Sequence, residues 1–209
     1  MIDFLKNQYA PFYGKRWDDA TMTIRMERPA SAVFEIKDKE PQIVQPAGKG
    51  VSVIRRGDVP VVVIDVESFT SMIHNTGNTP SACDFVICPV VGNDVVIFNE
   101  LTCSESKYVK PYHDPYTAED KEGKMEYAKG QIEKTLDRFY SVGNFLDAYN
   151  RKVALFSCRL TDKPGNSVMA RSCRKFSKVI YSLEHIKTVE KMKYGFQFHV
   201  RIYGKEFII

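Results

Sequence analysis

The stretch DFVICPVVGNDVVIFNEL, residues 84–101, decides the fold. It contains two runs rich in Val, Ile and Phe, which are typical of β-strands. The Gly92-Asn93 step between the runs is a favourable two-residue hairpin turn. Pro89 has no backbone N–H, so the first strand is expected to end there or to lie at a sheet edge. The stretch therefore predicts an antiparallel β-hairpin.

Further strands and one long helix are expected on either side of this hairpin. VVVID at 61–65 is a β-branched run that suits a buried strand, and KVALFSC at 152–158 is typical of another. Thr117 and Asp120 have the spacing of a capping box, which predicts a helix start. The apolar residues that follow recur at spacings of three and four, as on one face of a helix: Met125, Ala128, Ile132, Leu136 and Phe139. A helix between strands indicates an α/β or α+β protein with a central mixed β-sheet flanked by helices.

Length and composition favour one domain spanning residues 1–209. The chain has 209 residues, of which 44% are hydrophobic, so it can bury a core. No stretch approaches the roughly 20 apolar residues of a membrane-spanning helix, and the N-terminus lacks the apolar run of a signal peptide. The five cysteines form no CxxC pair, which favours buried thiols over a disulfide framework or zinc ligands. We expect a cytoplasmic protein without a membrane partner.

Charge is distributed unevenly along the chain. Residues 1–150 hold 17 Lys and Arg against 22 Asp and Glu, a net −5, whereas residues 151–209 hold 13 against 4, a net +9. A basic C-terminal third is typical of a surface that faces a polyanion, and equally of a solvated face or a contact with an acidic partner. Four basic residues at helical spacing form a candidate phosphate-contacting stripe: Arg171, Arg174, Lys175 and Lys178.

Two acidic residues mark the same end of the predicted hairpin. Asp84 opens the first strand and Glu100 closes the second, so their side chains are expected to be close together. Close carboxylates repel one another unless a cation shares them, and Mg²⁺ prefers such oxygen ligands. A metal ion there can activate a water and neutralise charge on a phosphate. The pair is therefore a candidate site for Mg²⁺ or Mn²⁺.

The region around this pair resembles the PD-(D/E)XK (restriction-endonuclease-like) nuclease superfamily. The resemblance rests on CDFVIC, then VVIFNELT, then the helix AKGQIEKTLDRF, then the strand VALFSC. It implies a restriction-endonuclease-like core at about 60–160, followed by a basic C-terminal extension at 161–209. The implied activity is metal-dependent cleavage of DNA.

The resemblance also implies roles for individual residues. Asp84 and Glu100 match the family's metal-binding acids, and the backbone of Leu101 is implied to lie near the metal. Gln131, on the following helix, matches a glutamine that borders the site in many members.

The chain departs from the family's E-x-K motif, because ELT occupies residues 100–102. The missing lysine positions the water and offsets phosphate charge, whereas the hydroxyl of Thr102 can hydrogen-bond a water but carries no charge. Lys124 is a candidate replacement, because it precedes Gln131 by two helical turns on the same face. Lys107, on the loop before that helix, is a second candidate.

Three functional hypotheses follow. In the first, a metal-dependent DNA endonuclease, Thr102 and Gln131 orient the water, Lys124 supplies the missing charge and the basic third holds the nucleic acid. The second is a non-catalytic interaction or assembly protein on the same scaffold: an antitoxin, immunity or phage-defence component. The third is an unrelated α/β binding module whose acids have no special role. DNA is favoured over RNA, and the small size favours a partner subunit (another protein or a second copy) or weak sequence preference.

Several other residues allow either a functional or a purely structural interpretation. Glu67 follows the VVVID run and is either a third acid of the site or a plain exposed residue at a helix start. Tyr108, Tyr112 and Tyr116 lie before the main helix and either stack on bases or serve as half-buried packing residues. The four histidines have no ligand-like spacing.

Overall fold

The expected hairpin forms the centre of a large sheet. The computed structural model describes residues 1–74, 81–114, 116–161 and 190–209. In spatial order, the strands of the sheet are β1 (Met26–Glu27), β5 (Val61–Asp65), β6 (Phe85–Pro89), β7 (Val95–Ser104), β10 (Arg151–Leu160), β12 (Gln197–Ile202) and β11 (Glu190–Lys191). β7, β10 and β12 are parallel to one another and the other neighbours are antiparallel, so the sheet is mixed.

The connection between β6 and β7 is longer than the two-residue turn that the sequence suggests. The strands pair with Phe85 opposite Asn99, but the link runs over residues 90–94. Pro89 ends β6 and cannot donate the next ladder hydrogen bond, so pairing stops before the turn. Within the link, Gly92 has a φ of +86°, which residues with a Cβ rarely adopt.

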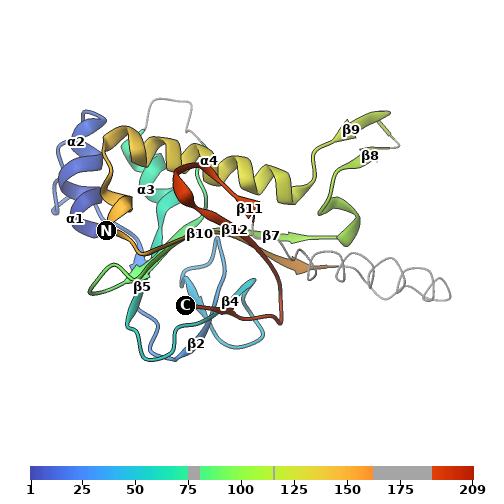
Figure 1. Cartoon of the computed structure of the whole chain (residues 1–209), viewed down its shortest axis with the longest axis horizontal. Helices are drawn as coiled ribbons and strands as arrows, with labels where there is room; N and C mark the ends of the chain where they lie inside the picture. The colour runs from blue at the N-terminus through green and yellow to red at the C-terminus, as the bar shows by residue number, and fades with distance from the viewer. Residues whose placement is uncertain (75–80, 115, 162–189) are drawn as a thin grey trace.

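Helices cover one face of the large sheet (Figure 1). The N-terminal helical segment, α3 and α4 lie on this side, and α4 forms the crossover that parallel β7 and β10 require. The helical elements of the described residues are α1 (Ile2–Phe4), the π-helical turn η1 (Leu5–Tyr9), α2 (Ala10–Phe12), α3 (Val66–Ile73), α4 (Lys124–Val142) and the 3-10 turns η2 (Ser106–Tyr108), η3 (Phe145–Ala148) and η4 (Lys193–Gly195).

A smaller sheet covers the opposite face (Figure 1). Its strands, in spatial order, are β13 (Phe207–Ile208), β4 (Ser52–Arg55), β2 (Val33–Ile36) and β3 (Val44–Gln45). A separate pair, β8 (Tyr112–Asp114) and β9 (Glu119–Lys121), projects from the body between β7 and α4. The α+β class with a central mixed sheet and flanking helices is therefore confirmed, and the second sheet is an addition to it.

Two apolar clusters separate the layers, one on each face of the large sheet. Val86 and Cys88 belong to the cluster under the helices, whereas their neighbours Phe85 and Ile87 belong to the cluster above the small sheet. This is the alternation that a strand imposes on successive side chains. Because both faces are covered, β6 and the middle parts of β7 (residues 95–98) and β10 (residues 153–156) are apolar on both faces instead of alternating with polar residues.

The long helix begins later than the capping pattern at Thr117 predicts. Residues 119–121 form β9, and α4 begins at Lys124 with Gly123 as its N-cap. A Cβ at Gly123 would lie 2.3 Å from the carbonyl carbon of Lys110, so this position requires glycine. Among the described residues, no helix is both long and apolar enough to cross a membrane.

Phe98 is expected to be a main support of the cluster under the helices. Its ring centroid lies 5.2 Å from that of Phe139 on α4 and 5.6 Å from that of Phe196, both edge-to-face. Phe98→Ala should lower the free energy of unfolding by about 3–5 kcal/mol, because it removes buried apolar surface and leaves a cavity. Urea denaturation measures the loss. Val91→Ala, at a position that is 85% exposed, should change it by less than about 0.5 kcal/mol, and equal losses would contradict this account.

Candidate metal centre

Asp84 and Glu100 lie side by side on the helical face of the large sheet. Asp84 directly precedes β6 and, by the register of the hairpin, is opposite Glu100 on β7. Alternation places both on the face that also carries Val86 and Phe98, under the helices. Each is only 7% exposed. The hairpin therefore brings two carboxyl groups together in a place that little water reaches.

The backbone around Asp84 connects it to two other elements. The N–H of Leu101 donates to Asp84 Oδ2 at 2.6 Å, so the Leu101 backbone is adjacent to this carboxylate. The carbonyl oxygen of Asp84 accepts a hydrogen bond of 3.0 Å from the N–H of Val66, the first residue of α3. These bonds place the first turn of α3, with Glu67, next to the acidic pair.

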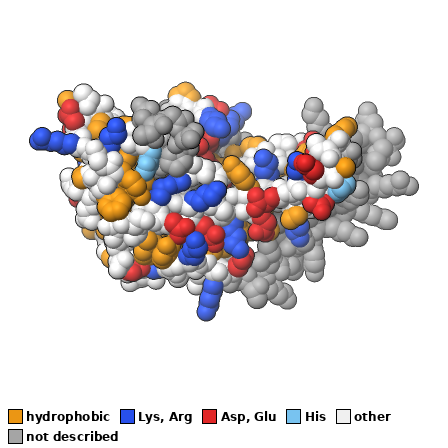
Figure 2. Space-filling view, turned by 90° about the horizontal axis from the view of Figure 1, so that it is seen from above, with side chains coloured by type: hydrophobic (Ala, Val, Ile, Leu, Met, Phe, Trp, Pro, Cys, Tyr) orange, Lys and Arg blue, Asp and Glu red, His pale blue; other side chains and the backbone are white. Residues whose placement is uncertain are grey.

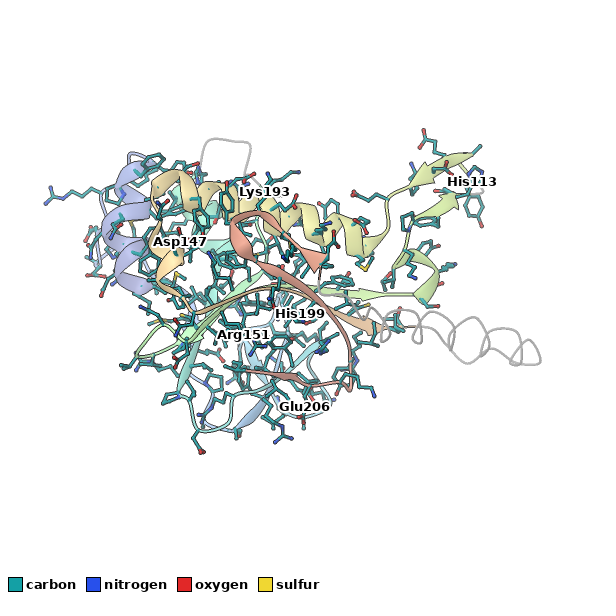
Figure 3. The ribbon with its side chains drawn as sticks, viewed as in Figure 1. His113, Asp147, Arg151, Lys193, His199 and Glu206 are labelled. Carbon is teal, nitrogen blue, oxygen red and sulfur yellow. The ribbon has the colours of Figure 1, made fainter. Side chains whose placement is uncertain are left out.

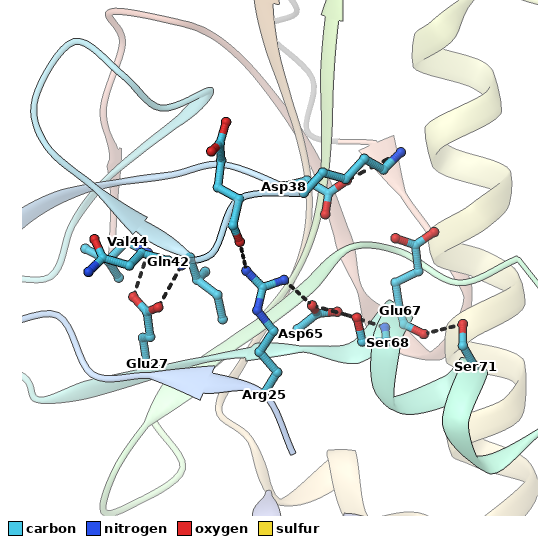
Figure 4. Close-up of polar contacts among 12 residues, drawn as sticks. Arg25, Glu27, Asp38, Gln42, Val44, Asp65, Glu67, Ser68 and Ser71 are labelled. Carbon is cyan, nitrogen blue, oxygen red and sulfur yellow. Dashed lines mark hydrogen bonds and ion pairs between the residues drawn. The ribbon is translucent and has the colours of Figure 1, made fainter. Parts of the chain in front are cut away.

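Glu67 and Asp38 complete a cluster of four carboxyl groups. One ligand oxygen each from Asp38, Glu67 and Asp84 lies within 4.8 Å of the others. Figure 4 shows the Asp38 and Glu67 side chains reaching the same region from different elements, Asp38 from the turn after β2 and Glu67 from α3. Glu67 is therefore a partly buried member of the cluster at the start of α3, and Asp38 is a member that the sequence did not indicate.

The electrostatics of the cluster are dominated by burial and by like charges. Burial raises the pKa of Asp84 to about 8, the acidic neighbours Asp38 and Glu67 add to the shift, and the Leu101 N–H opposes it. Burial raises the pKa of Glu100 to about 9, with the charges of Asp84 and Glu67 as the next contributions. Burial and the charge of Asp38 also raise the pKa of Glu67. The carboxyl groups therefore resist losing their protons next to one another.

Glu100 carries a buried oxygen that the described residues do not satisfy. Its Oε2 has essentially no solvent contact and no hydrogen-bond partner among them. A buried acceptor without a partner costs free energy, and a buried carboxylate costs more. A divalent cation would reverse both penalties, and carboxylate oxygens are the ligands that Mg²⁺ and Mn²⁺ prefer. Asp38, Glu67 and Asp84 therefore fit a centre for such an ion, and Glu100 is their buried acidic neighbour.

Helix α4 holds the chain that leads into Asp84. The side chains of Gln131, Thr135 and Arg138 recur at spacings of four and three on one helix face. Gln131 Nε2 donates to the carbonyl of Ala82 at 3.2 Å, Thr135 Oγ1 accepts from the N–H of Cys83 at 2.9 Å, and Arg138 Nη2 donates to the carbonyl of Ser81 at 2.6 Å. The amide nitrogen of Gln131 is thus bonded to the backbone two residues before Asp84.

The other residues predicted from the sequence lie on three different elements: Thr102 on β7, Lys124 on α4 and Lys107 on η2. Thr102 is partly buried and follows Glu100 by two positions, so its hydroxyl is on the same strand face. Lys124 is exposed at the first position of α4, and the main electrostatic influences on the acidic pair are other carboxyl groups. Lys107 pairs with Glu105 at 2.9 Å.

A lysine that the sequence reading missed lies at the rim of the cluster. Lys39 Nζ is 3.7 Å from Asp38 Oδ2, and its charge lowers the pKa of Glu67. Its backbone has a φ of 60°, an uncommon conformation for a residue with a side chain. Its side chain is 85% exposed, so the ammonium group is available to an anion. Nothing local in the charged run KDKE at 37–40 reveals that this turn meets the hairpin.

The predicted nucleic-acid contacts are placed only in part. The stripe of Arg171, Arg174, Lys175 and Lys178 lies outside the described residues. Residues 162–189 hold 6 Lys and Arg against 2 Asp and Glu, so the described residues are balanced at 24 against 24. Figure 2 accordingly shows basic and acidic side chains interspersed on the helical side.

The aromatic and histidine candidates are spread over the molecule. Tyr108 and Tyr112 pack edge-to-face with centroids 4.8 Å apart, and only Tyr116, at 96% exposure, is free to stack on a base. Figure 3 shows His113 on the projecting β8–β9 pair and His199 on β12 within the body, so these two do not share a site.

Comparison of the chain with family models, with curated proteins and with solved structures gave no match.

The raised pKa values predict that the metal-free protein loses stability as the pH rises. Between about pH 5 and pH 8 the folded protein holds protons on Asp84 and Glu100 that the unfolded chain has released. The free energy of unfolding should therefore fall with pH, by about 1.4 kcal/mol per pH unit for each group that is protonated only when folded. Urea denaturation in EDTA across this range measures the slope.

Two comparisons check the origin of that slope. Asp84→Asn and Glu100→Gln cannot titrate and should each flatten it. Mg²⁺ should restore stability at high pH, because the ion binds the deprotonated carboxylates. A wild-type profile that is flat, or equal to those of the variants, would contradict the assignment.

Proposed function

We propose that this protein is a metal-dependent phosphodiesterase of the nuclease type, with DNA as its substrate. The observation that carries the proposal is the set of four carboxyl groups, in which the buried Glu100 Oε2 has acidic neighbours and no hydrogen-bond partner among the described residues. Asp38, Glu67, Asp84 and Glu100 would hold Mg²⁺ or Mn²⁺. A folded protein keeps buried like charges together at a cost in stability, and such costs concentrate at functional sites.

The order of the elements supports the resemblance to PD-(D/E)XK nucleases. An antiparallel β5–β6–β7 run leads through α4 to β10, which is parallel to β7. The two acids of the hairpin lie on the helical face of this sheet. This is the arrangement of hairpin, helix and strand on which the sequence resemblance rests.

The chain's own residues can be assigned to the steps of hydrolysis. Water adds its oxygen to phosphorus while the bond to one ester oxygen breaks, and that oxygen leaves with a proton. A bound cation would supply polarisation of the phosphate and a lower pKa for its water. The Thr102 hydroxyl would hydrogen-bond the water, because it shares a strand face with Glu100. Lys39, at the rim, would offset the phosphate charge that the family's E-x-K lysine otherwise balances.

The second candidate is a non-catalytic interaction protein on the same scaffold, such as an antitoxin, immunity or phage-defence component. Thr102 in place of lysine favours it, as does the exposed position of Lys124. In both proposals the protein is cytoplasmic, and a partner subunit or a second copy of the chain would supply any sequence recognition.

Cleavage of DNA should require both the metal and the buried acids. Purified protein should cut plasmid or single-stranded DNA with Mg²⁺ or Mn²⁺ and not with EDTA. Asp84→Asn and Glu100→Gln should each lower the rate by at least about 100-fold. Asp94→Asn is the matched control, because Asp94 is an exposed acid at the other end of the same hairpin. RNA of the same sequence serves as the competing substrate.

Two other results would change the conclusion. Folded wild-type protein that binds the metal but cuts neither nucleic acid supports the interaction protein. Cleavage that survives in both acid variants contradicts the assigned centre.

Lys39→Ala should lower the rate of cleavage by about 10- to 100-fold, because it removes the positive charge at the rim. Alanine keeps the same backbone requirement at φ 60°, so the change is confined to the side chain. Lys39→Arg should retain part of the activity, and Lys124→Ala should remain within about twofold of wild type. Steady-state kinetics on a labelled oligonucleotide measures this, and the opposite ranking would assign the charge to Lys124.

A further inference from the structure

Arg25 connects the two elements that bring Asp38 and Glu67 to the cluster. Its Nη1 donates to Asp65 Oδ2 at 2.8 Å, and its Nη2 donates to the carbonyl oxygen of Glu40 (Figure 4). Asp65 is the N-cap of α3, the helix that carries Glu67, and Glu40 is in the turn that carries Asp38. One guanidinium group thus joins the start of α3 to the turn after β2.

Glu27 holds the other end of the same turn. Its two carboxylate oxygens accept from the backbone N–H groups of Ile43 and Val44, at 2.7 and 2.8 Å. Arg25 and Glu27 flank Met26 on one short segment, which pairs with β5 next to the cluster. The turn is therefore held at both ends by side chains of one segment.

The Asp65 end of this connection is rigid. The Asp65 side chain is 3% exposed and also accepts from the N–H and the hydroxyl of Ser68, both at 2.8 Å. The carbonyl of Arg25 accepts in addition from the Asp65 N–H at 2.9 Å. A planar guanidinium can reach two acceptors in fixed directions, whereas an ammonium group cannot reproduce that fork.

We propose that Arg25 is a positioning residue of the metal centre, which sets the place of Asp38 relative to Glu67 without contacting the metal. This inference depends on the proposed centre but not on nuclease activity. Partners of metal ligands commonly alter metal affinity by about 10- to 100-fold. Arg25 should act through Asp38, because its second nitrogen holds the turn on which Asp38 lies.

The test is a double-mutant cycle read by Mn²⁺ affinity, using titration calorimetry on the full chain. Arg25→Lys keeps the charge opposite Asp65 and removes the fork, and should weaken Mn²⁺ binding about 10-fold. In the Asp38→Asn background the same change should cost less than about twofold, because the residue it positions is already gone. Arg56→Lys is the control: Arg56 also donates to backbone carbonyls, those of Ser31, Val59 and Ala30, and should leave the affinity unchanged.

Each other result overturns the inference. Additive losses in the cycle, or an equal loss in Arg56→Lys, would mean that Arg25 supports the fold and does not position Asp38. If Arg25→Lys does not fold by circular dichroism, Glu27→Gln, which loosens the other end of the turn, is measured in the same cycle with the same expectation. Wild-type protein that binds no Mn²⁺ rejects the centre and the inference together. Binding without DNA cleavage rejects only the nuclease, and the cycle still decides the role of Arg25.

Discussion

Repulsion among buried carboxyl groups is the constraint on which the rest of this structure depends. Asp84 and Glu100 are each 7% exposed and have Asp38 and Glu67 as acidic neighbours, so a negative charge on either group would have little water around it and other carboxyl groups beside it. The two carboxyl groups therefore keep their protons to a higher pH, which is what their raised pKa values express. A divalent cation would replace those protons, and the same groups that destabilise the metal-free protein would then become its ligands.

A scaffold that holds repelling groups together must be rigid, and two sets of hydrogen bonds, one on the helical face and one at the sheet edge, provide this rigidity. On the helical face, three side chains of α4 hydrogen-bond to the backbone of the three residues before Asp84: Gln131, Thr135 and Arg138. At the edge of the sheet, Arg25 fastens the turn with Asp38 to the N-cap of α3. The sheet between them is covered on both faces, so its strands cannot shift without opening an apolar cluster. The cluster is thus a property of the packed layers and not of the hairpin alone.

The positive charge nearest the cluster comes from the turn after β2 and not from the strand that carries Glu100. Thr102 leaves the strand face without a charge, but Lys39 reaches the rim from the smaller sheet. A charge supplied from a turn is more exposed and less fixed than one supplied from a strand. This difference is why both a nuclease and an interaction protein are proposed for this scaffold.

The sequence by itself determined the two strands of the hairpin and the long helix, because each depends on residues close together in the chain. Alternation and β-branching set the strands, and the spacing from Met125 to Phe139 set the helix. The parallel pairing of β7 with β10, and the five-residue link that puts Asp84 opposite Glu100, appear only in the folded structure. Only the tertiary structure decided that Asp38, Lys39 and Arg25 join them. Asp38 and Lys39 lie in a turn and Arg25 directly precedes β1, and no local propensity indicates which sheet edge a turn will meet. The packing of the two sheets determines which sheet edge the turn meets, and so determines which residues make up the cluster.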